Sequence, residues 1–204
     1  MDLWTGSAPP LLASASRTRR LLLEGAGIAV DAVASGVDER AVEAEAASRR
    51  LDPAALAAGL AAEKALAVSR RHPDRLVIGA DQVLDLDGAV LHKPADRAAA
   101  AAHLARLAGR THALRSAVAL ARGGAVEESF VESARLRMRP LGPDAIAAYL
   151  DRIGEAALQG AGAYQVEGLG IHLFDAIEGD HSTILGLPLI PLLRALRGRG
   201  LVAF

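Results

Sequence analysis

Carboxylates that follow apolar segments are the first residues of this sequence that could do chemistry. Asp81 stands in Gly79-Ala80-Asp81-Gln82, directly after the apolar run Leu76-Val77-Ile78. Asp38 and Glu39 are expected in a loop that follows another apolar stretch. A carboxylate at such a place is costly to bury unless it is paired, hydrogen-bonded or bound to a metal. Two of them could hold a hard cation such as Mg²⁺ together with waters and substrate phosphates. Taken singly, Asp81 is explained equally well by turn capping, and Glu39 better by a surface charge.

A segment rich in Ser and Arg lies between two short apolar runs. It reads Ser14-Ala15-Ser16-Arg17-Thr18-Arg19-Arg20, after Leu11-Leu12-Ala13 and before Leu21-Leu22-Leu23. This order predicts a strand, a polar loop and a helix. Hydroxyls, backbone N–H groups and guanidiniums at the positive end of a helix form a phosphate cradle. Taken alone, helix capping and solvated charge explain the segment better.

Only two of the 23 basic residues are lysines, Lys64 and Lys93. Genome composition explains the excess of arginine equally well. Lys64 lies four residues from both Leu60 and Val68, so its stem follows the edge of a helical apolar stripe, and Lys93 precedes the stiff Pro94. Each alone is best read as a lysine whose stem covers apolar surface. Together with the arginines they would supply cations for a polyphosphate.

Glycines crowd the segment from Gly160 to Gly170, and a second motif runs from Glu178 to Leu189. Glycine lets the backbone approach a ligand closely, and Glu167 within the first segment could read a base edge. A set of tight turns is the better explanation of this segment alone. The histidines lack the H-x-x-x-H spacing of a zinc site, and neither a Walker-type phosphate loop nor a G-x-S-x-G nucleophile elbow occurs.

The elements that would position these residues alternate irregularly between strand and helix, which predicts a mixed α+β fold. We expect helix starts at Asp52-Pro53 and Pro143, a hairpin turn at Asp87-Gly88 and a long hairpin turning at Gly123-Gly124. Strands are expected over 11–13, 28–34, 76–78, 83–84, 89–91, 111–121, 125–138 and 171–177. Helices are expected after the 14–20 loop and over 52–71, 96–108, 143–152 and 188–197.

Length and composition exclude several classes of protein. The chain has 204 residues, a formal net charge of −1 and no Cys. One domain over residues 1–204 is expected, with residues 1–9 as an N-terminal tail and two small lobes as an alternative. The near-zero charge argues against a nucleic-acid or membrane partner. Without a signal peptide, a membrane span or disulfides, we expect a soluble protein of the cytoplasm.

Taken in order, the motifs resemble those of the Maf nucleotide pyrophosphatases, and the resemblance spans nearly the whole chain. Each motif alone is weak, but the ordered set is specific. The motifs are Leu12-Ala13-Ser14-Ala15-Ser16-x-x-Arg19-Arg20, Gly79-Ala80-Asp81-Gln82, Lys93-Pro94, Gly162-Ala163-Tyr164, Glu167-Gly168-Leu169-Gly170, and Glu178-Gly179-Asp180 through Gly186-Leu187-Pro188-Leu189.

The resemblance implies an enzyme of nucleotide metabolism with a house-cleaning role. Such an enzyme cuts a nucleoside triphosphate between its α and β phosphates, with a divalent metal cation, Mg²⁺ or Mn²⁺, as cofactor. The family fold is an elongated α/β structure similar to inosine triphosphatases, with a mixed sheet flanked by helices and two lobes around a cleft, and it is often a homodimer. The implied roles are Asp81 as proton acceptor and metal ligand, Glu39 as a metal-side carboxylate, and Ser14, Ser16, Arg19, Lys64 and Lys93 as substrate contacts.

Three positions bear on substrate choice, and a fourth, Arg17, departs from the family pattern in a way that bears on the stiffness of the loop. Arg17 replaces the proline that the family usually has, and Thr18 occupies a position similar to a specificity determinant. Gln82 and Glu167 resemble the 7-methyl-GTP branch, whereas the dTTP/UTP branch tends to have Thr and Gln. A carboxylate can accept two hydrogen bonds from guanine and favours a base carrying positive charge. A modified purine nucleotide is therefore expected, with dTTP/UTP pyrophosphatase and a non-catalytic nucleotide-binding regulator of cell division as alternatives.

Overall fold

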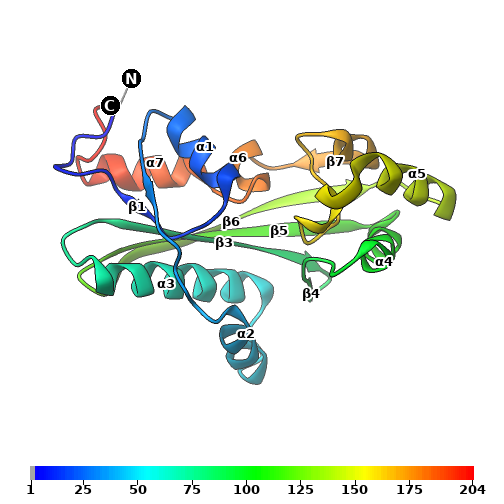
Figure 1. Cartoon of the computed structure of the whole chain (residues 1–204), viewed down its shortest axis with the longest axis horizontal. Helices are drawn as coiled ribbons and strands as arrows, with labels where there is room; N and C mark the ends of the chain where they lie inside the picture. The colour runs from blue at the N-terminus through cyan, green and yellow to red at the C-terminus, as the bar shows by residue number, and fades with distance from the viewer. Residues whose placement is uncertain (1–2) are drawn as a thin grey trace. The chain divides into compact units, whose positions relative to one another are not determined.

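A computed structural model describes residues 3–204 and shows a mixed α+β chain whose strands join in one mixed sheet (Figure 1). The strand order is β2-β1-β3-β5-β6-β7, and β4 pairs with β3. The residues fall into two compact units. The first contains residues up to Gln82, Ser116–Glu132 and Asp180–Phe204, and the second contains Val83–Arg115 and Ser133–Gly179. Strands β3, β5 and β6 pass from one unit into the other.

Strand β3 (Val77–Leu86) is the central element of the first unit. Its neighbour β1 (Leu11–Leu12) runs parallel to both β3 and β2 (Asp31–Ala32). All but one of the ten residues of β3 are buried, because helices cover both faces of the sheet here, as in parallel sheets. Strands β5 (Thr111–Arg122) and β6 (Ala125–Met138) follow, joined by Gly123 and Gly124, which both have positive φ.

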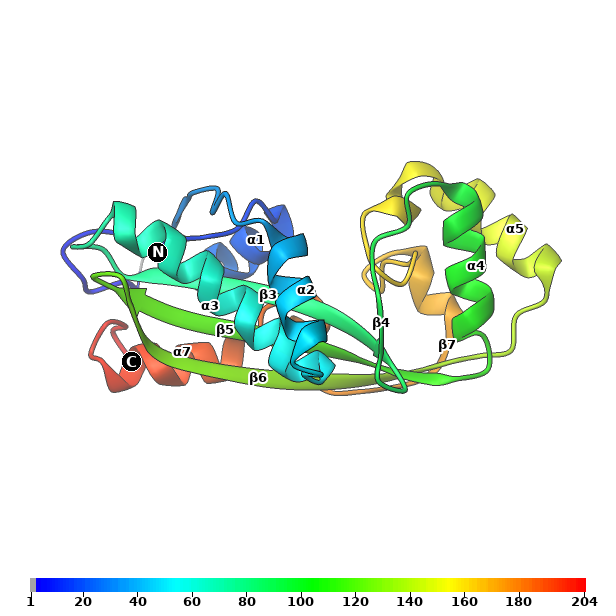
Figure 2. The same cartoon turned by 90° about the horizontal axis from the view of Figure 1, so that it is seen from below.

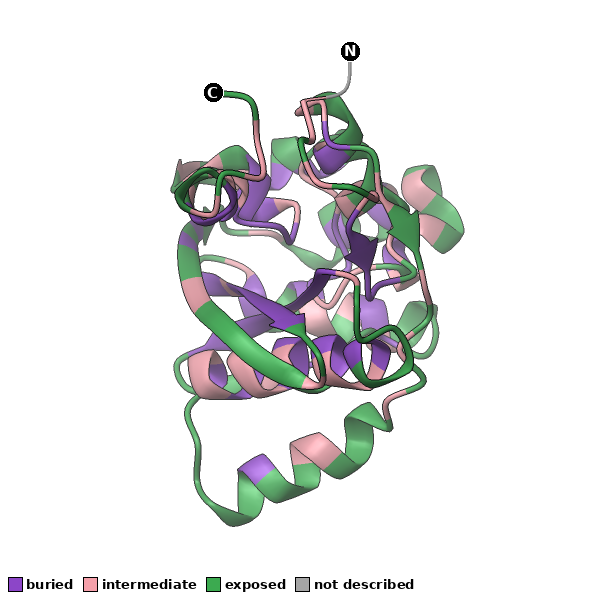
Figure 3. Cartoon of the chain, turned by 90° about the vertical axis from the view of Figure 1, so that its left-hand side faces the viewer, coloured by how far each residue is buried: buried purple, intermediate pink, exposed green. Residues whose placement is uncertain are grey.

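Helix α3 (Pro53–Arg71) covers one face of β3, and α1 (Arg17–Gly25) and α7 (Leu189–Gly198) cover the other (Figure 1). Asp52 caps α3 and Pro53 occupies its first turn, as the sequence predicts. The short α6 (His181–Ile184) precedes α7. Helix α2 (Glu39–Ser48) contacts α3 and is mainly exposed (Figure 3). The core between sheet, α1 and α7 is aliphatic and includes Leu12, Leu23, Ile78, Leu120, Leu187 and Leu192.

The second unit packs helices α4 (Arg97–Leu107) and α5 (Pro143–Ile153) side by side (Figure 2). Strand β4 (Ala89–Leu91) is antiparallel to β3, and β7 (Phe174–Glu178) is antiparallel to the end of β6. Two 3-10 helices, η1 (Gly154–Leu158) and η2 (Leu169–Leu173), flank the glycine-rich segment. Inside the unit, the rings of His112, Tyr164 and Phe174 contact one another.

The structure confirms the expected helices over 52–71, 96–108, 143–152 and 188–197 to within about two residues, and also the long hairpin. Three expectations about the strands are wrong. β3 does not end at Gly79-Ala80-Asp81 but continues to Leu86, the strand expected over 28–34 is only Asp31–Ala32, and residues 171–173 form a 3-10 turn before β7. Ser16 begins α1 earlier than expected, because its side chain accepts from Arg19 N and caps the helix.

The segment around Asp38 and Glu39 was expected to be a loop and is instead the start of α2. Asp38 is the N-cap of this helix, with its side chain accepting from Ala41 N, and Glu39 is the first helical residue. An acidic residue in the first turn suits the positive end of the helix. The capping Asp followed by alanines and glutamates was the sequence signal for this helix.

Residues 3–5, expected to be part of a tail, instead pair with the other end of the chain. Trp4 forms an antiparallel bridge with Val202, and Thr5 N donates to Leu201 O. Trp4 also packs against the aliphatic core, which explains the attachment. Residues 1 and 2 lie outside the described part of the chain. None of the helices within residues 3–204 combines the length and apolar character that crossing a bilayer requires.

Candidate active site

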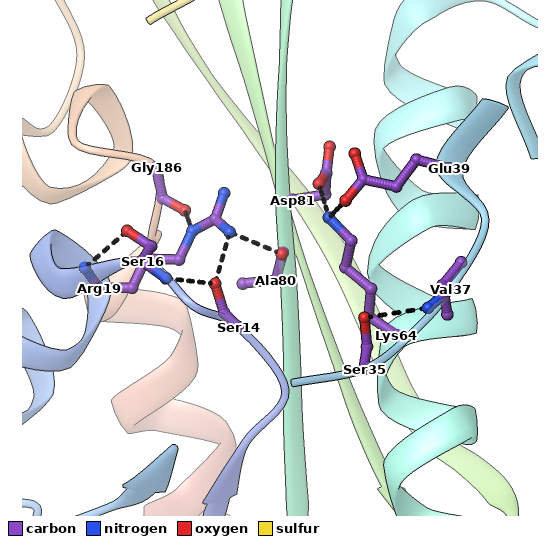
Figure 4. A network of polar contacts seen from close by, with 10 residues as sticks. All are labelled: Ser14, Ser16, Arg19, Ser35, Val37, Glu39, Lys64, Ala80, Asp81 and Gly186. Carbon is purple, nitrogen blue, oxygen red and sulfur yellow. Dashed lines mark hydrogen bonds and ion pairs between the residues drawn. The ribbon is translucent and has the colours of Figure 1, made fainter. Parts of the chain in front are cut away.

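The side chain of Lys64 lies between two carboxylates on the first unit. Its Nζ is 2.5 Å from Asp81 Oδ1 and 2.7 Å from Glu39 Oε1 (Figure 4). Lys64 and Asp81 are both buried, whereas the Glu39 side chain is half exposed. The remaining oxygens, Asp81 Oδ2 and Glu39 Oε2, have no hydrogen-bond or ion-pair partner within residues 3–204. The group therefore offers unpaired carboxylate oxygens beside a buried cation.

Three elements bring these side chains together. Lys64 belongs to the buried stripe of α3, where Leu60 and Val68 lie one helical turn away on either side. Gly79 lets α3 approach β3, because a Cβ built at this glycine would lie 2.2 Å from Ala61 O and 2.8 Å from Ala65 N. This close approach places Lys64 opposite Asp81, two residues further along β3. The first turn of α2 adds Glu39.

The donor set suits a hard divalent cation. Within residues 3–204 no group of three or more His, Asp or Glu side chains comes together as a closed metal site. Mg²⁺, however, is usually bound through one or two carboxylates plus waters and substrate phosphates. Asp81 Oδ2 and Glu39 Oε2 are carboxylate oxygens of this kind, so the residues present fit such an ion bound together with a phosphate ligand.

Arg19 is held on the other side of β3 by three acceptors. Its Nε donates to Gly186 O at 2.8 Å, and its Nη1 donates to Ala80 O at 2.8 Å and to Ser14 Oγ at 3.1 Å (Figure 4). Burial lowers the pKa of Arg19 from its ordinary value, while the charges of Asp81 and Glu39 raise it in part. An arginine remains protonated under these conditions. It is therefore a fixed cation that still has Nη2 for a ligand.

The hydroxyls of Ser14 and Ser16 both lie at the N-terminus of α1. Ser14 Oγ accepts from Ser16 N at 3.2 Å, and Ser16 Oγ accepts from Arg19 N at 3.3 Å. Both hydroxyls act as acceptors in these bonds, so both keep their protons for an incoming oxygen. Thr18 lies half buried in the first turn. The arrangement is a helix N-terminus with two free hydroxyl donors, which suits an anion.

Gln82 follows Asp81 on β3, and its side chain is tied to the α6 turn. Its Nε2 donates to Thr183 O and Ile184 O, both at 3.0 Å, and to Ser116 Oγ at 2.9 Å. Asp180 caps this turn. Burial raises the pKa of Asp180, but hydrogen bonds from Ser182 and Thr183 outweigh it and bring the pKa below its ordinary value.

The last two predicted site residues belong to the second unit. Lys93 is exposed beside the buried Pro94, between β4 and α4, and Glu167 is exposed in the segment between η1 and η2. Tyr149 lies near Glu167. The pKa of Tyr149 is raised to about 12, mainly by burial; the backbone of Gln165 acts to lower it, and the charge of Glu167 acts to raise it. Tyr149 is thus a neutral phenol near the carboxylate predicted to read the base.

The structure therefore brings together seven of the predicted residues on the first unit: Ser14, Ser16, Arg19, Glu39, Lys64, Asp81 and Gln82. Sequence reasoning missed Ser116, which is fully buried and bonded to Gln82. No local pattern marks Ser116, because it is one small residue in a long strand. The motif from Glu178 to Leu189 is visible in the sequence, but the sequence does not predict what its residues do. In the structure its carbonyl oxygens accept hydrogen bonds from Arg19 and Gln82.

Comparison with known proteins gives a consistent result. The family model described as Maf-like protein matches residues 10–199. A protein of Rhodopseudomonas palustris (strain BisB18) named nucleoside triphosphate pyrophosphatase is 53% identical over 204 residues, the full length of both chains. A Nitrobacter winogradskyi protein of the same name is 53% identical over 203 residues, also covering 100% of both. A Rhizobium johnstonii protein named 7-methyl-GTP pyrophosphatase is 52% identical over 192 residues, or 94% of this chain and 96% of its own.

Proposed function

The chain belongs to the Maf-like protein family, and from this premise we propose that it is a hydrolase that splits nucleoside triphosphates into a monophosphate and pyrophosphate. The observation that carries the proposal is the placement of charges around Asp81. Two carboxylates and Lys64 meet on one side of β3, and the α1 N-terminus, with Arg19, is held to the neighbouring residue Ala80. Acidic groups for a metal and a water, next to donors for phosphate, are what anhydride hydrolysis needs.

Asp81 is the proposed proton acceptor. Its Oδ1 is held by Lys64, which orients the carboxylate, while the two lone pairs of Oδ2 stay available, one for a metal ion and one for a water molecule. As the water attacks, its proton passes to Asp81 and the bond between the α and β phosphates breaks. Glu39 and Asp81 would hold a Mg²⁺ or Mn²⁺ ion. Such an ion, when bound, neutralises charge on the phosphate oxygens.

The polyphosphate is proposed to bind at the N-terminus of α1. Ser14 and Ser16 donate their hydroxyl protons to phosphate oxygens, and the first backbone N–H groups of the helix do the same. Arg19 contributes Nη2, since its other donors are engaged. Lys64 and Lys93 complete the proposed set of phosphate contacts.

The proposed substrate is a guanine nucleotide carrying a methyl group, such as 7-methyl-GTP. Gln82 and Glu167 are similar to the residues of that branch, and the Rhizobium relative carries that activity in its name. A carboxylate at position 167 can accept two hydrogen bonds from guanine, and its charge favours a positively charged base. The other two relatives described above are named without a base. The second candidates are dTTP and UTP, the substrates that the resemblance implies for the other branch of the family.

A panel of nucleoside triphosphates tests the proposal. The wild-type protein is incubated with ordinary nucleotides and with 7-methyl-GTP, with Mg²⁺, with Mn²⁺ and with a chelator, and pyrophosphate release is measured. We expect release that depends on the metal and is fastest with the methylated nucleotide. Nucleotide binding without any release would instead support the non-catalytic regulator. A cytoplasmic location remains a prediction from the composition and the N-terminal sequence, and a homodimer remains a prediction from the family resemblance.

A further inference from the structure

The carbonyl oxygens of the turn from Asp180 to Gly186, the 180–186 turn, hold both neighbours of Asp81 on β3. Thr183 O and Ile184 O accept from the side chain of Gln82. Gly186 O accepts from Arg19 Nε, and Arg19 in turn donates to Ala80 O. The 180–186 turn is therefore connected to the residue before Asp81 and to the residue after it.

The turn is itself tightly built. Asp180 accepts from Thr183 N at 2.9 Å, from Thr183 Oγ1 at 3.1 Å and from Ser182 Oγ. Ser182 Oγ accepts from Leu189 N at 3.0 Å, which ties the turn to the start of α7. Thr183 and Ser182 are both buried. Because the side chains of Asp180, Ser182 and Thr183 are bonded within the turn, the turn offers its carbonyls in fixed positions.

Ser116 joins the turn to Gln82. Its hydroxyl donates to Thr183 O at 2.7 Å and accepts from Gln82 Nε2 at 2.9 Å, and the side chain is fully buried on β5. A hydroxyl has a single proton, which here goes to the carbonyl, so only an acceptor lone pair faces Gln82. Ser116 therefore requires a donor at that position.

These bonds determine which end of the Gln82 amide faces the turn. Ile184 O and the acceptor side of Ser116 both need donors, and the two protons of the Gln82 amide nitrogen can supply them. Thr183 O, which already accepts from Ser116 Oγ and Gly186 N, lies 3.0 Å from the same nitrogen. A flipped amide would set Oε1 against two carbonyl oxygens. Oε1 has no partner within residues 3–204. It is the atom left for a nucleotide, and it can only accept a hydrogen bond.

We propose that Ser116 is a positioning residue of the nucleotide site, which fixes the Gln82 amide so that Oε1 is presented to a donor group of the nucleotide. The proposal rests on the pyrophosphatase function proposed above. The group recognised would be a base N–H, a base amino group or a sugar hydroxyl, and a group that only accepts would be disfavoured at this place.

Ser116→Ala tests the proposal, and Ser69→Ala is its matched control. Ser69 is also fully buried in the first unit, and its hydroxyl accepts from Gly124 N at 3.0 Å, but within residues 3–204 it has no hydrogen bond to a predicted site residue. Both variants should lose similar thermal stability. Only Ser116→Ala should lower kcat/KM for the best nucleotide of the panel, by about fivefold and mainly through KM, the factor that one ordinary hydrogen bond is worth.

Combining Ser116→Ala with Gln82→Ala shows whether Ser116 acts through Gln82. If it does, adding Ser116→Ala to the Gln82→Ala protein should change kcat/KM by less than about twofold, because the side chain that it positions is already gone. If Ser116→Ala lowers kcat/KM by the same factor in the wild-type protein and in the Gln82→Ala protein, the proposal is overturned. Equal losses of kcat/KM in Ser116→Ala and Ser69→Ala would overturn it as well.

A measurement without substrate separates this proposal from the proposed function. In ¹⁵N-labelled protein, the side-chain amide of Gln82 should exchange its hydrogens with water slowly, and Ser116→Ala but not Ser69→Ala should accelerate that exchange. Unchanged exchange in Ser116→Ala contradicts the positioning role even if the protein is an active pyrophosphatase. If Ser116→Ala accelerates the exchange but the wild-type protein releases no pyrophosphate, the positioning of Gln82 by Ser116 is supported and only the proposed function is contradicted.

Discussion

Arg19 Nη1 donates to the carbonyl oxygen of Ala80 on β3. This carbonyl would accept from the next backbone N–H of β1 if β1 continued beside β3. Leu11 N and Ala13 N donate in turn to Leu76 O and Ile78 O, at 2.8 and 2.9 Å. The chain then leaves the sheet, and the Arg19 bond to Ala80 O, at 2.8 Å, continues the row. An arginine predicted to bind phosphate is therefore also part of the sheet.

Replacing Arg19 with lysine should show this double role. An ammonium cannot reproduce the fixed fork of donors that reaches Gly186, Ala80 and Ser14. We expect Arg19→Lys to lower the free energy of unfolding by about 2 kcal/mol, in urea titrations, and to reduce pyrophosphate release. Arg20→Lys is the matched control, since Arg20 is exposed and its single ion pair within residues 3–204 is with Glu24, one turn on. It should change stability by less than about 0.5 kcal/mol. Equal stability of the two variants would show that Arg19 has no structural role.

Asp81→Asn should abolish pyrophosphate release while leaving nucleotide binding largely intact. An amide keeps the size of the side chain but cannot take a proton from water, so we expect kcat to fall by about 10²-fold or more. Calorimetric titration with the nucleotide measures binding separately. Asp85→Asn serves as the control, because Asp85 is equally buried on the same strand and is also paired with a cation, Arg115. Unchanged turnover in Asp81→Asn would remove Asp81 from the mechanism.

Gly79→Ala should destabilise the protein by about 3 kcal/mol, because the new methyl group would collide with the backbone of α3 at Ala61 and Ala65. Relief of the collision has to move α3 away from β3, and Lys64 with it. We therefore also expect lower turnover. Gly59→Ala within α3 is the control, since its methyl group would meet nothing within 4 Å. It should stabilise the helix by about 0.5–1 kcal/mol. Two variants of equal stability in chemical denaturation would contradict the close approach.

His112 should make the stability of the protein fall in mild acid. Burial lowers its pKa to about 4 from 6.5, so the unfolded chain takes up the proton first as the pH falls. The neutral His112 contributes its full share of stability above about pH 6.5. This share is lost as the pH falls from 6.5 towards 4, and the total loss is roughly 3 kcal/mol. Denaturation midpoints measured from pH 7 to pH 4 should show this loss, and His112→Gln should reduce it. The exposed His172 provides the control, His172→Gln, which should leave the profile unchanged.

Glu167→Gln should weaken the use of 7-methyl-GTP more than the use of UTP. The substitution removes one acceptor and the negative charge, both of which favour a positively charged guanine, whereas uracil gains nothing from that charge. Values of kcat/KM for the two nucleotides check this. If both fall by the same factor, Glu167 does not read the base.

The sequence predicted those parts of the fold that depend on neighbouring residues better than those that depend on contacts between distant elements. Asp52-Pro53 and Pro143 marked their helices correctly, because caps and proline act within a few residues. The end of β3 was misjudged at Gly79-Ala80-Asp81. Gly79 was interpreted as part of a turn, but it instead allows α3 to pack closely against β3. The neighbouring residues in the sequence do not indicate such a contact between two elements.

The sequence by itself determined the family and the kinds of groups at the site, because ordered motifs and residue chemistry are local properties of the chain. Only the tertiary structure decided which partners each group has. It placed Lys64 between Asp81 and Glu39, tied Arg19 to Ala80, and turned the amide of Gln82 through the unforeseen Ser116. Those pairings join residues 17 to 61 positions apart, and such separations along the chain are closed by the packing of helices on a sheet rather than by any local sequence pattern.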